Sequence, residues 1–275
     1  MPAKKKPAAK KPSTARFDDR ICNLVPSRGT DQDWTFRDAL ASGVLAAPGP
    51  LPASVDLRKA WWTINNQEST GSCVGWAAAD GLMRYHLVAA NRLDKTKLLS
   101  PRFVWMASKE TDEFTKRPET FIEVAGTTLK AAMDIMRNYG NVLDADLPFR
   151  INTLMFGGND NTFYANASTR KAANYFNLGK DLSQWRSWIA ANGPILVGLS
   201  VDETWENAAA TGGKLDTFVP ASVRGGHAVC IVGYTPERFI IRNSWGTTWG
   251  DKGFGYASPA YIADAFFNES YGVTL

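Results

Sequence analysis

A loop that turns into a buried helix, with a cysteine at the junction, constrains this chain more than any other feature. Gly71 ends the loop, Ser72 is a residue type that favours the N-cap position, and Cys73 follows at once. The next apolar residues recur at helical spacing and are Ala77, Ala78, Ala79, Leu82, Met83, Leu87 and Val88. We therefore predict that Cys73 occupies the first turn of a buried helix, where the helix dipole and free backbone N–H groups favour a thiolate.

A cysteine at a helix start is not by itself a catalytic residue, because most unpaired cysteines are small buried hydrophobic residues. A nucleophilic cysteine also needs a base, and the chain has two histidines, His86 and His227. His86 lies thirteen residues after Cys73 in the same predicted helix. More than three helical turns separate these two side chains, so they cannot meet. We interpret His86 as a structural or surface residue, which leaves His227 as the candidate base.

His227 lies where a strand is predicted to begin. It follows two glycines, which let a ligand or another backbone approach closely, and it precedes an apolar run at residues 228–234. Asn243 comes sixteen residues later. Its side chain could accept a hydrogen bond from one imidazole nitrogen and leave the other nitrogen facing the sulfur. Trp245 could shield that bond, although most tryptophans simply pack in a core.

The composition places the chain among globular proteins and excludes several other classes. It has 275 residues, of which 44% are hydrophobic, enough for one large domain or two lobes with a core. No apolar run is long enough to cross a bilayer, and residues 1–12 lack the hydrophobic stretch of a secretory signal. Three scattered cysteines do not make a disulfide framework, so we expect a reducing compartment, the cytoplasm.

Excess positive charge is confined to the start of the chain. The net charge is +4, but residues 1–16 contain six basic and no acidic residues. The remaining 25 basic and 27 acidic residues leave the folded part close to neutral, with no sign of a nucleic-acid-binding face. We predict that residues 1–16 form a disordered, solvated, Lys-rich tail. The alternative is a weak, salt-sensitive arm for nucleic acid or another acidic surface.

The predicted elements divide residues 51–275 into two lobes. Helical patterns dominate residues 60–175, and strand-like runs dominate residues 176–275. Helices are expected from Cys73 on and at residues 101–108, 127–139 and 182–191, and strands at 194–201, 228–234 and 239–242. A helical half followed by a β half predicts an α+β fold with a cleft between the lobes, a common place for a site.

The motifs around these candidates resemble those of the papain-like family of cysteine peptidases. Gln67 precedes Cys73 by six residues, as the oxyanion-hole glutamine does in that family. The other matches are residues 71–73 around the cysteine, 226–234 around the histidine, 243–250 and 253–256 from the asparagine on, and 52–58 at the mature amino terminus. Found together and in this order, they extend the resemblance over residues 51–275.

The spacing of the motifs and two departures from the pattern qualify this resemblance. His227 lies 154 residues and Asn243 170 residues after Cys73, longer than usual, which indicates insertions between the motifs. Thr70 stands where many members have a disulfide cysteine, in keeping with a reducing environment. Val74 replaces the usual aromatic residue after the nucleophile, so packing on that side of the helix must differ.

The resemblance implies a papain-like two-lobed fold, with a helical lobe and a β-barrel-like lobe on either side of the active-site cleft. It implies a cysteine endopeptidase in which Cys73 is the nucleophile, His227 its base and Asn243 the residue that orients the base. The Gln67 amide and the Cys73 backbone N–H would form the oxyanion hole.

The same resemblance implies how substrate would lie in the cleft. Gly126 is similar to the glycine along which the substrate backbone runs, and Ala228 would line the pocket for the residue two positions before the cut. The expected partners are a protein or peptide substrate and a separate protein inhibitor or immunity protein. Neither a metal ion, a cofactor nor a membrane is expected.

Three other functions share some of these features. An inactive peptidase fold used only for binding is disfavoured, because all four catalytic positions are intact. A cell-wall amidase with a Cys–His pair is disfavoured by the 154-residue separation and by the segment that begins at Asn243. A bacterial toxin or effector that cuts a protein in a rival's cytoplasm would use the same mechanism, and the sequence permits it.

Residues 17–50 are expected to form a lead-in segment that packs on the surface of the body and ends at the prolines of residues 48–52. Phe17, Trp34 and Phe36 are its expected apolar anchors. The alternative is a short inhibitory segment that blocks the cleft until it is removed. We favour the packing interpretation because the segment is shorter than the family's typical prodomain. This interpretation predicts that Cys73 reacts with thiol-directed reagents without prior processing of the chain.

Overall fold

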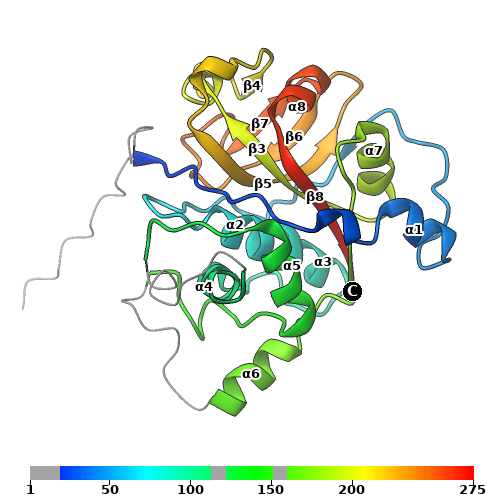
Figure 1. The fold of residues 1–275 in the computed structure, drawn as a ribbon, viewed down its shortest axis with the longest axis vertical. Helices are drawn as coiled ribbons and strands as arrows, with labels where there is room; N and C mark the ends of the chain where they lie inside the picture. Colours follow the sequence, from blue (N-terminus) through cyan, green and yellow to red (C-terminus); the bar gives the residue numbers. More distant parts are fainter. Residues whose placement is uncertain (1–18, 113–121, 151–159) are drawn as a thin grey trace, which may run out of the picture.

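A helical lobe and a sheet lobe face each other in the structure, and the N-terminal segment runs between them (Figure 1). The computed structural model describes residues 19–112, 122–150 and 160–275. The Lys-rich tail at residues 1–16 and the expected anchor Phe17 lie outside the described residues. The α+β fold class predicted from the sequence is confirmed.

The central helix of the helical lobe begins at Cys73, as predicted. Its consecutive parts are α2 (Cys73–Trp76), a π-helical stretch (Ala77–Met83) and α3 (Arg84–Ala89). Ser72 holds the N-cap position, but its side chain makes no capping hydrogen bond. The Ser72 hydroxyl lies 2.6 Å from the Thr70 hydroxyl instead, so the predicted cap is wrong in this detail.

Further helices complete the helical lobe, and their ends follow sequence signals. They are α4 (Pro101–Thr111), α5 (Leu129–Asn138) and α6 (Asp160–Ser168). The Ser100 side chain caps α4 by accepting a hydrogen bond from the Phe103 N–H. Gly140, just after α5, has a φ of 87°, the left-handed conformation that glycine adopts most easily at a helix end. Both ends were expected from the sequence.

The second lobe is built on one mixed sheet. Its strands are β1 (Val55–Asp56), β2 (Asn174–Asn177), β3 (Ile195–Val201), β4 (Lys214–Leu215), β5 (Gly225–Tyr234), β6 (Phe239–Arg242), β7 (Phe254–Ala257) and β8 (Phe266–Thr274). Their order in the sheet is β2-β8-β3-β5-β6-β7-β4, and β1 pairs with β5 outside this order. Among the strand pairs of the described residues, β4 and β7 alone run parallel. The sheet does not close from β2 to β4, so this lobe, expected to be barrel-like, is not a closed barrel.

Direct packing of the central helix on β5 joins the two lobes. At a point of close approach, a Cβ on Gly81 would lie 2.7 Å from the Cys230 sulfur. The Cys230 thiol donates a hydrogen bond to the Ala77 carbonyl at 3.1 Å. Because protein interiors are close-packed, any larger residue at position 81 would push the helix away from the sheet.

Helix α1 (Phe36–Ala41) attaches the N-terminal segment to the sheet lobe. A capping box between Thr35 and Asp38 starts this helix. Phe36 is 4% exposed, and its ring meets Trp188 of α7 (Leu182–Ala191) edge-on, with the ring centroids 5.7 Å apart. Trp34, the other expected anchor, is 57% exposed, so that part of the prediction is wrong.

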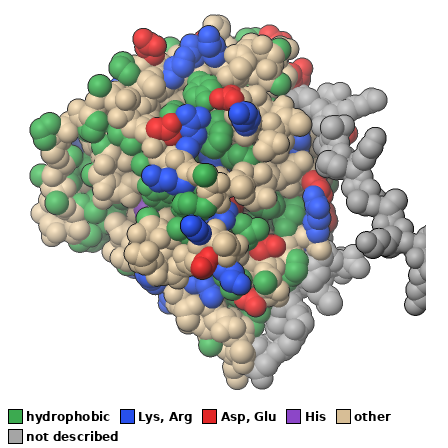
Figure 2. Space-filling view, turned by 180° about the vertical axis from the view of Figure 1, so that it is seen from behind, with side chains coloured by type: hydrophobic (Ala, Val, Ile, Leu, Met, Phe, Trp, Pro, Cys, Tyr) green, Lys and Arg blue, Asp and Glu red, His purple; other side chains and the backbone are tan. Residues whose placement is uncertain are grey.

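Charges of both signs are mixed on the surface. Figure 2 shows the face opposite to that of Figure 1, where basic and acidic side chains are interspersed and form no single basic field. This agrees with the nearly neutral charge of the chain after residue 16. Among the described residues, no helix combines the length and apolar character that crossing a bilayer requires.

Phe36→Ala should destabilise the protein, whereas Trp34→Ala should leave its stability close to that of the wild type. Truncating a buried Phe costs about 3–5 kcal/mol, because apolar contacts are lost and a cavity remains. Trp34 is largely in solvent and has little packing to lose. The measurement is chemical denaturation of each full-length variant. Equal losses for the two variants would contradict the packing described for α1.

Candidate active site

The histidine and the asparagine singled out in the sequence meet where β5 begins and β6 ends. His227 is the third residue of β5, and Asn243 directly follows β6. The His227 Nε2 and Asn243 Oδ1 atoms are 2.8 Å apart, and both residues are buried. Because an amide oxygen can only accept, His227 donates through Nε2 and its Nδ1 is left for other chemistry.

Cys73 is fully buried at the first turn of the central helix. Burial raises the pKa of its thiol to about 11, while backbone hydrogen bonds at Ala228, Val74 and Cys73 itself act in the opposite direction. The bond at Ala228 puts the sulfur beside the residue that follows His227. Burial also lowers the pKa of the His227 imidazole to about 4, opposed by its hydrogen bond with Asn243. The closed site therefore favours a neutral thiol and a neutral imidazole.

Tryptophan side chains form the wall around the imidazole. The Trp245 ring lies 4.7 Å from the His227 ring centroid at an interplanar angle of 32°, and Trp205 meets the imidazole edge-on at 5.7 Å. Trp249 packs against both tryptophans. Trp245 was expected as a shield. Trp205 was missed because it belongs to a short 3₁₀ turn (Glu203–Trp205) outside every motif.

Gln67 is fully buried, and its side-chain amide is held at both ends. Its Oε1 accepts a hydrogen bond from the Ser244 hydroxyl at 2.8 Å, and its Nε2 donates to the Thr70 carbonyl at 3.0 Å. Ser244 follows Asn243, so it connects the glutamine loop to the asparagine. That Ser244 and Thr70 hold the Gln67 amide was not predicted from the sequence. The position of Ser244 inside the asparagine motif was the sequence signal that could have indicated it.

His86 takes no part in this arrangement. It lies in α3, and its side chain is buried with a ring-centroid distance of 5.8 Å to Tyr85. Burial lowers the pKa of its imidazole to about 4, and nothing else contributes to that shift. The structure agrees with the interpretation of His86 as a structural residue.

The N-terminal segment crosses this site between the two lobes (Figure 1). Arg20 donates a hydrogen bond to the Trp245 carbonyl at 3.1 Å. The Cys22 carbonyl lies against Gly225, where a Cβ would come within 2.1 Å of the oxygen. The pKa of Cys22 is raised to about 12, first by burial and next by the nearby Cys73 thiol. The segment therefore covers the candidate nucleophile.

Backbone pairing and a buried leucine hold the segment in place. The Leu24 N–H donates to the Gly226 carbonyl at 3.0 Å, and the Leu24 side chain shares a buried cluster with Ala228. The Asn23 carbonyl lies against Gly126, where a Cβ would come within 1.9 Å of the oxygen. Gly126 thus contacts the N-terminal segment where the resemblance implied contact with substrate, and Ala228 belongs to the buried cluster that Leu24 joins.

This course corrects the expectation that residues 17–50 pack only on the outer surface and leave the cleft open. Helix α1 does pack on the sheet lobe, but residues 20–25 lie in the cleft and Cys73 is 0% exposed. The physical reason is that the segment fills the cleft with an apolar side chain and pairs its backbone groups with both lobes. The Val25 N–H, for example, donates to the Thr127 carbonyl at 3.1 Å.

Leu24→Ala should increase the rate at which iodoacetamide alkylates Cys73 in the full-length chain. Opening of the cleft is expected to limit the reaction. A loss of about 2 kcal/mol in the free energy that keeps the segment docked then corresponds to a rate increase of roughly 30-fold. Val44→Ala, which changes an exposed residue of the same segment, is the control. Peptide mapping assigns the alkylated cysteine. A rate at Cys73 equal to that of the control would show that Leu24 does not hold the cleft closed.

A family model and curated relatives match the sequence of this chain. The model of the papain family of cysteine proteases matches residues 51–261. A senescence-specific cysteine protease of Arabidopsis thaliana is 26% identical over 220 residues, which are 75% of this chain and 56% of that protein. Cysteine proteinase 1 of Dictyostelium discoideum is 22% identical over 251 residues, 87% of this chain and 63% of that protein. The chain therefore spans less than two thirds of the length of these relatives.

Solved structures share the fold at low sequence identity. Xylellain, a cysteine protease from Xylella fastidiosa, superposes with a TM-score of 0.74 at 18% identity, covering 93% of this chain and 96% of that one. Procathepsin L2 from the larval midgut of Tenebrio molitor gives a TM-score of 0.66 at 20% identity, covering 94% and 80%. The papain-like fold expected from the motifs is therefore confirmed. With a family model that matches most of its length, the chain belongs to the papain family of cysteine proteases.

Proposed function

We propose that this protein is a cysteine endopeptidase whose N-terminal segment holds it in a latent state. The observation that carries the proposal is the contact between His227 and Asn243 beside a buried Cys73 at a helix start. A helix N-terminus favours a thiolate, and an oriented imidazole supplies the base that a thiol needs. Family membership supports the same chemistry.

The proposed reaction uses these side chains in two steps. In the first step the Cys73 thiolate attacks the peptide carbonyl carbon, and His227 protonates the departing amine, which leaves a thioester on the enzyme. In the second step water attacks the thioester, His227 takes a proton from that water, and the carboxylic acid and the free thiol are released. Asn243 keeps the imidazole ring in its orientation throughout.

The oxyanion that forms in each step needs hydrogen-bond donors. The backbone N–H of Cys73 and the side-chain amide of Gln67 are the proposed donors. Gln67 suits this role because Ser244 and Thr70 already fix its amide, so little reorganisation is needed during the reaction.

The latent state follows from the position of residues 20–25. They occupy the space that a substrate would need, beside Gly126 and Ala228. Their burial of the site also raises the pKa of Cys73 and lowers that of His227, so the reactive thiolate–imidazolium pair is disfavoured. Displacement of the segment would restore both access and solvation. The sequence motivates four further proposals, namely a protein or peptide substrate, a separate protein inhibitor or immunity protein, a cytoplasmic location and a role as a delivered effector.

Cys73→Ala and His227→Ala should abolish peptide hydrolysis, whereas His86→Ala should keep it. The first two variants remove the nucleophile and its base, and the third changes a buried imidazole far from the cleft. The measurement is hydrolysis of a denatured protein substrate by each full-length variant in a Leu24→Ala background, in which the docked segment is loosened, with folding checked by circular dichroism. Residual hydrolysis by a pure Cys73→Ala preparation, or loss of hydrolysis in folded His86→Ala, would contradict the assignment.

Gln67→Ala should lower kcat by roughly 100- to 1000-fold and leave KM nearly unchanged, because an oxyanion donor acts mainly in the transition state. Asn243→Ala should also be impaired but active, since Asn243 only orients the base. Steady-state kinetics on a fluorogenic peptide, with each variant in the Leu24→Ala background that loosens the docked segment, distinguish these outcomes. A change in Gln67→Ala that is confined to KM would count against its role as an oxyanion donor.

A further inference from the structure

We propose that Asp80 is a positioning residue that sets the place of Asn243 through Arg242. This inference rests on the proposed function, because it concerns the geometry of the same catalytic pair. Asp80 lies in the π-helical stretch of the central helix, about two turns after Cys73. Such stretches inside α-helices occur frequently at functional sites.

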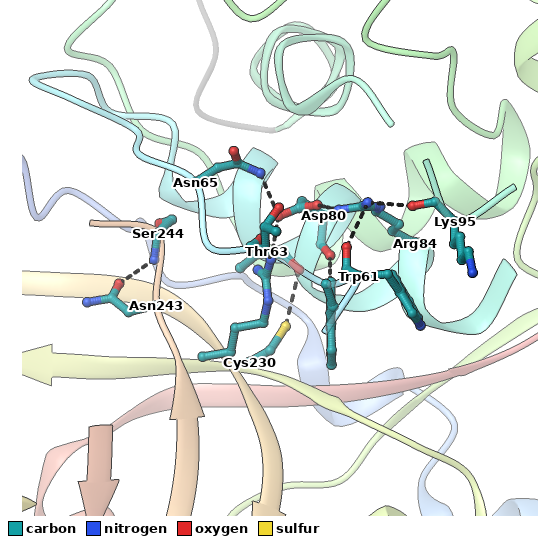
Figure 3. Close-up of polar contacts among 12 residues, drawn as sticks. Trp61, Thr63, Asn65, Asp80, Arg84, Lys95, Cys230, Asn243 and Ser244 are labelled. Carbon is teal, nitrogen blue, oxygen red and sulfur yellow. Dashed lines mark hydrogen bonds and ion pairs between the residues drawn. The ribbon is translucent and has the colours of Figure 1, made fainter. Parts of the chain in front are cut away.

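The Asp80 carboxylate binds two arginines, one through each oxygen (Figure 3). Its Oδ2 lies 2.6 Å from Arg242 Nη2, and its Oδ1 lies 2.9 Å from Arg84 Nη1. Asn65 Nδ2 also donates to Oδ2 at 3.4 Å. The side chains of Asp80, Arg84 and Arg242 are only 2–3% exposed, so water does not weaken these contacts.

These contacts join three chain segments, each of which carries a residue of the site. Asp80 belongs to the helix that begins at Cys73, and Arg242 directly precedes Asn243. The third segment is the loop that leads to Gln67. In this loop the Thr63 carbonyl accepts a hydrogen bond from Arg242 Nη2 at 2.7 Å. The same loop presents the Trp62 indole, which donates to the Asp80 backbone carbonyl at 2.6 Å.

An anchor at Arg242 acts directly on Asn243, because Asn243 is the first residue beyond the last paired residue of β6. The ladder between β5 and β6 reaches Arg242, which pairs with Cys230, and ends there. Past this point a hydrogen bond from the Asn243 N–H to the Gly253 carbonyl, at 3.1 Å, holds the backbone. The Arg242 guanidinium ties the same position to the helix of the nucleophile, across the lobe boundary.

A buried ion pair adds little net stability over well-packed apolar residues, because desolvation offsets its Coulomb attraction. What it adds is a directional contact, since the planar guanidinium must meet the carboxylate in a fixed orientation. At this place a directional contact fixes the distance from the helix of Cys73 to the residue that orients His227. Positioning of the catalytic pair is therefore the distinctive contribution of Asp80 and Arg242.

Arg84 offers a matched control for Arg242. Both arginines bind the Asp80 carboxylate and both are buried. The other contacts of Arg84 are with the carbonyls of Trp61 and Lys95, at 3.3 and 2.9 Å, on the side away from Asn243 in Figure 3. Arg→Lys at either position keeps the charge and removes the guanidinium geometry.

The experiment introduces Arg242→Lys and Arg84→Lys separately into full-length Leu24→Ala protein, in which the docked segment is loosened, and this parent protein is the reference for both. Arg242→Lys should lower kcat about 10- to 100-fold with KM unchanged, the range typical for residues that orient a reacting group. Arg84→Lys should keep the kcat of the Leu24→Ala parent even if both variants lose the same thermal stability. In an Asn243→Ala background, Arg242→Lys should have almost no further effect on kcat, because the residue it positions is already absent.

A second readout does not need hydrolysis. The pH profile of Cys73 alkylation reports the thiolate–imidazolium pair, and it should shift in Arg242→Lys but not in Arg84→Lys. If protein whose docked segment is loosened by Leu24→Ala alkylates at Cys73 but hydrolyses no peptide, the proposed function fails, while the pH profiles of Cys73 alkylation still decide the positioning role. Coincident profiles for the two variants, or equal kcat losses, would overturn the inference.

Discussion

The close packing of the central helix on β5 is the constraint on which the site depends. A glycine at position 81 lets the helix reach the Cys230 sulfur, and a thiol hydrogen bond to Ala77 closes the contact. Cys230 lies three residues after His227 on the same strand. The contact therefore sets the distance between the helix that begins with Cys73 and the strand that carries the imidazole. No loop conformation could fix that distance as rigidly, because side-chain packing in a core tolerates little displacement.

Burial by the N-terminal segment changes the chemistry of the site as well as access to it. The segment and the tryptophan wall keep water from the cleft, so the charged forms of Cys73 and His227 lose their hydration. The same tryptophan wall would strengthen electrostatic stabilisation of a reacting group once substrate replaced the segment. The proposed latent and active states thus depend on one property of the cleft, its low polarity, and differ in what fills the cleft.

The motif residues could be predicted from sequence because their chemistry restricts residue type and spacing. The end of α5 at Gly140 was predictable too, since it follows from local backbone preferences. The open sheet was not, because pairs such as Asn174 with Thr274 join strands a hundred residues apart and no local pattern specifies them. The course of residues 20–25 also lay beyond local patterns, since it depends on two glycines, Gly126 and Gly225, that admit its backbone only in the folded structure.

Covalent trapping of Leu24→Ala protein, in which the docked segment is loosened, with a peptidyl vinyl sulfone and subsequent peptide mapping tests the central claim most directly. This electrophile reacts with a thiolate only when its peptide portion lies in the cleft and the thiol has a working base. The account predicts an adduct on Cys73, none on Cys22 or Cys230, and loss of the adduct in His227→Ala. An adduct on Cys22 or Cys230 in place of Cys73, or labelling of Cys73 that persists unchanged in His227→Ala, would contradict it.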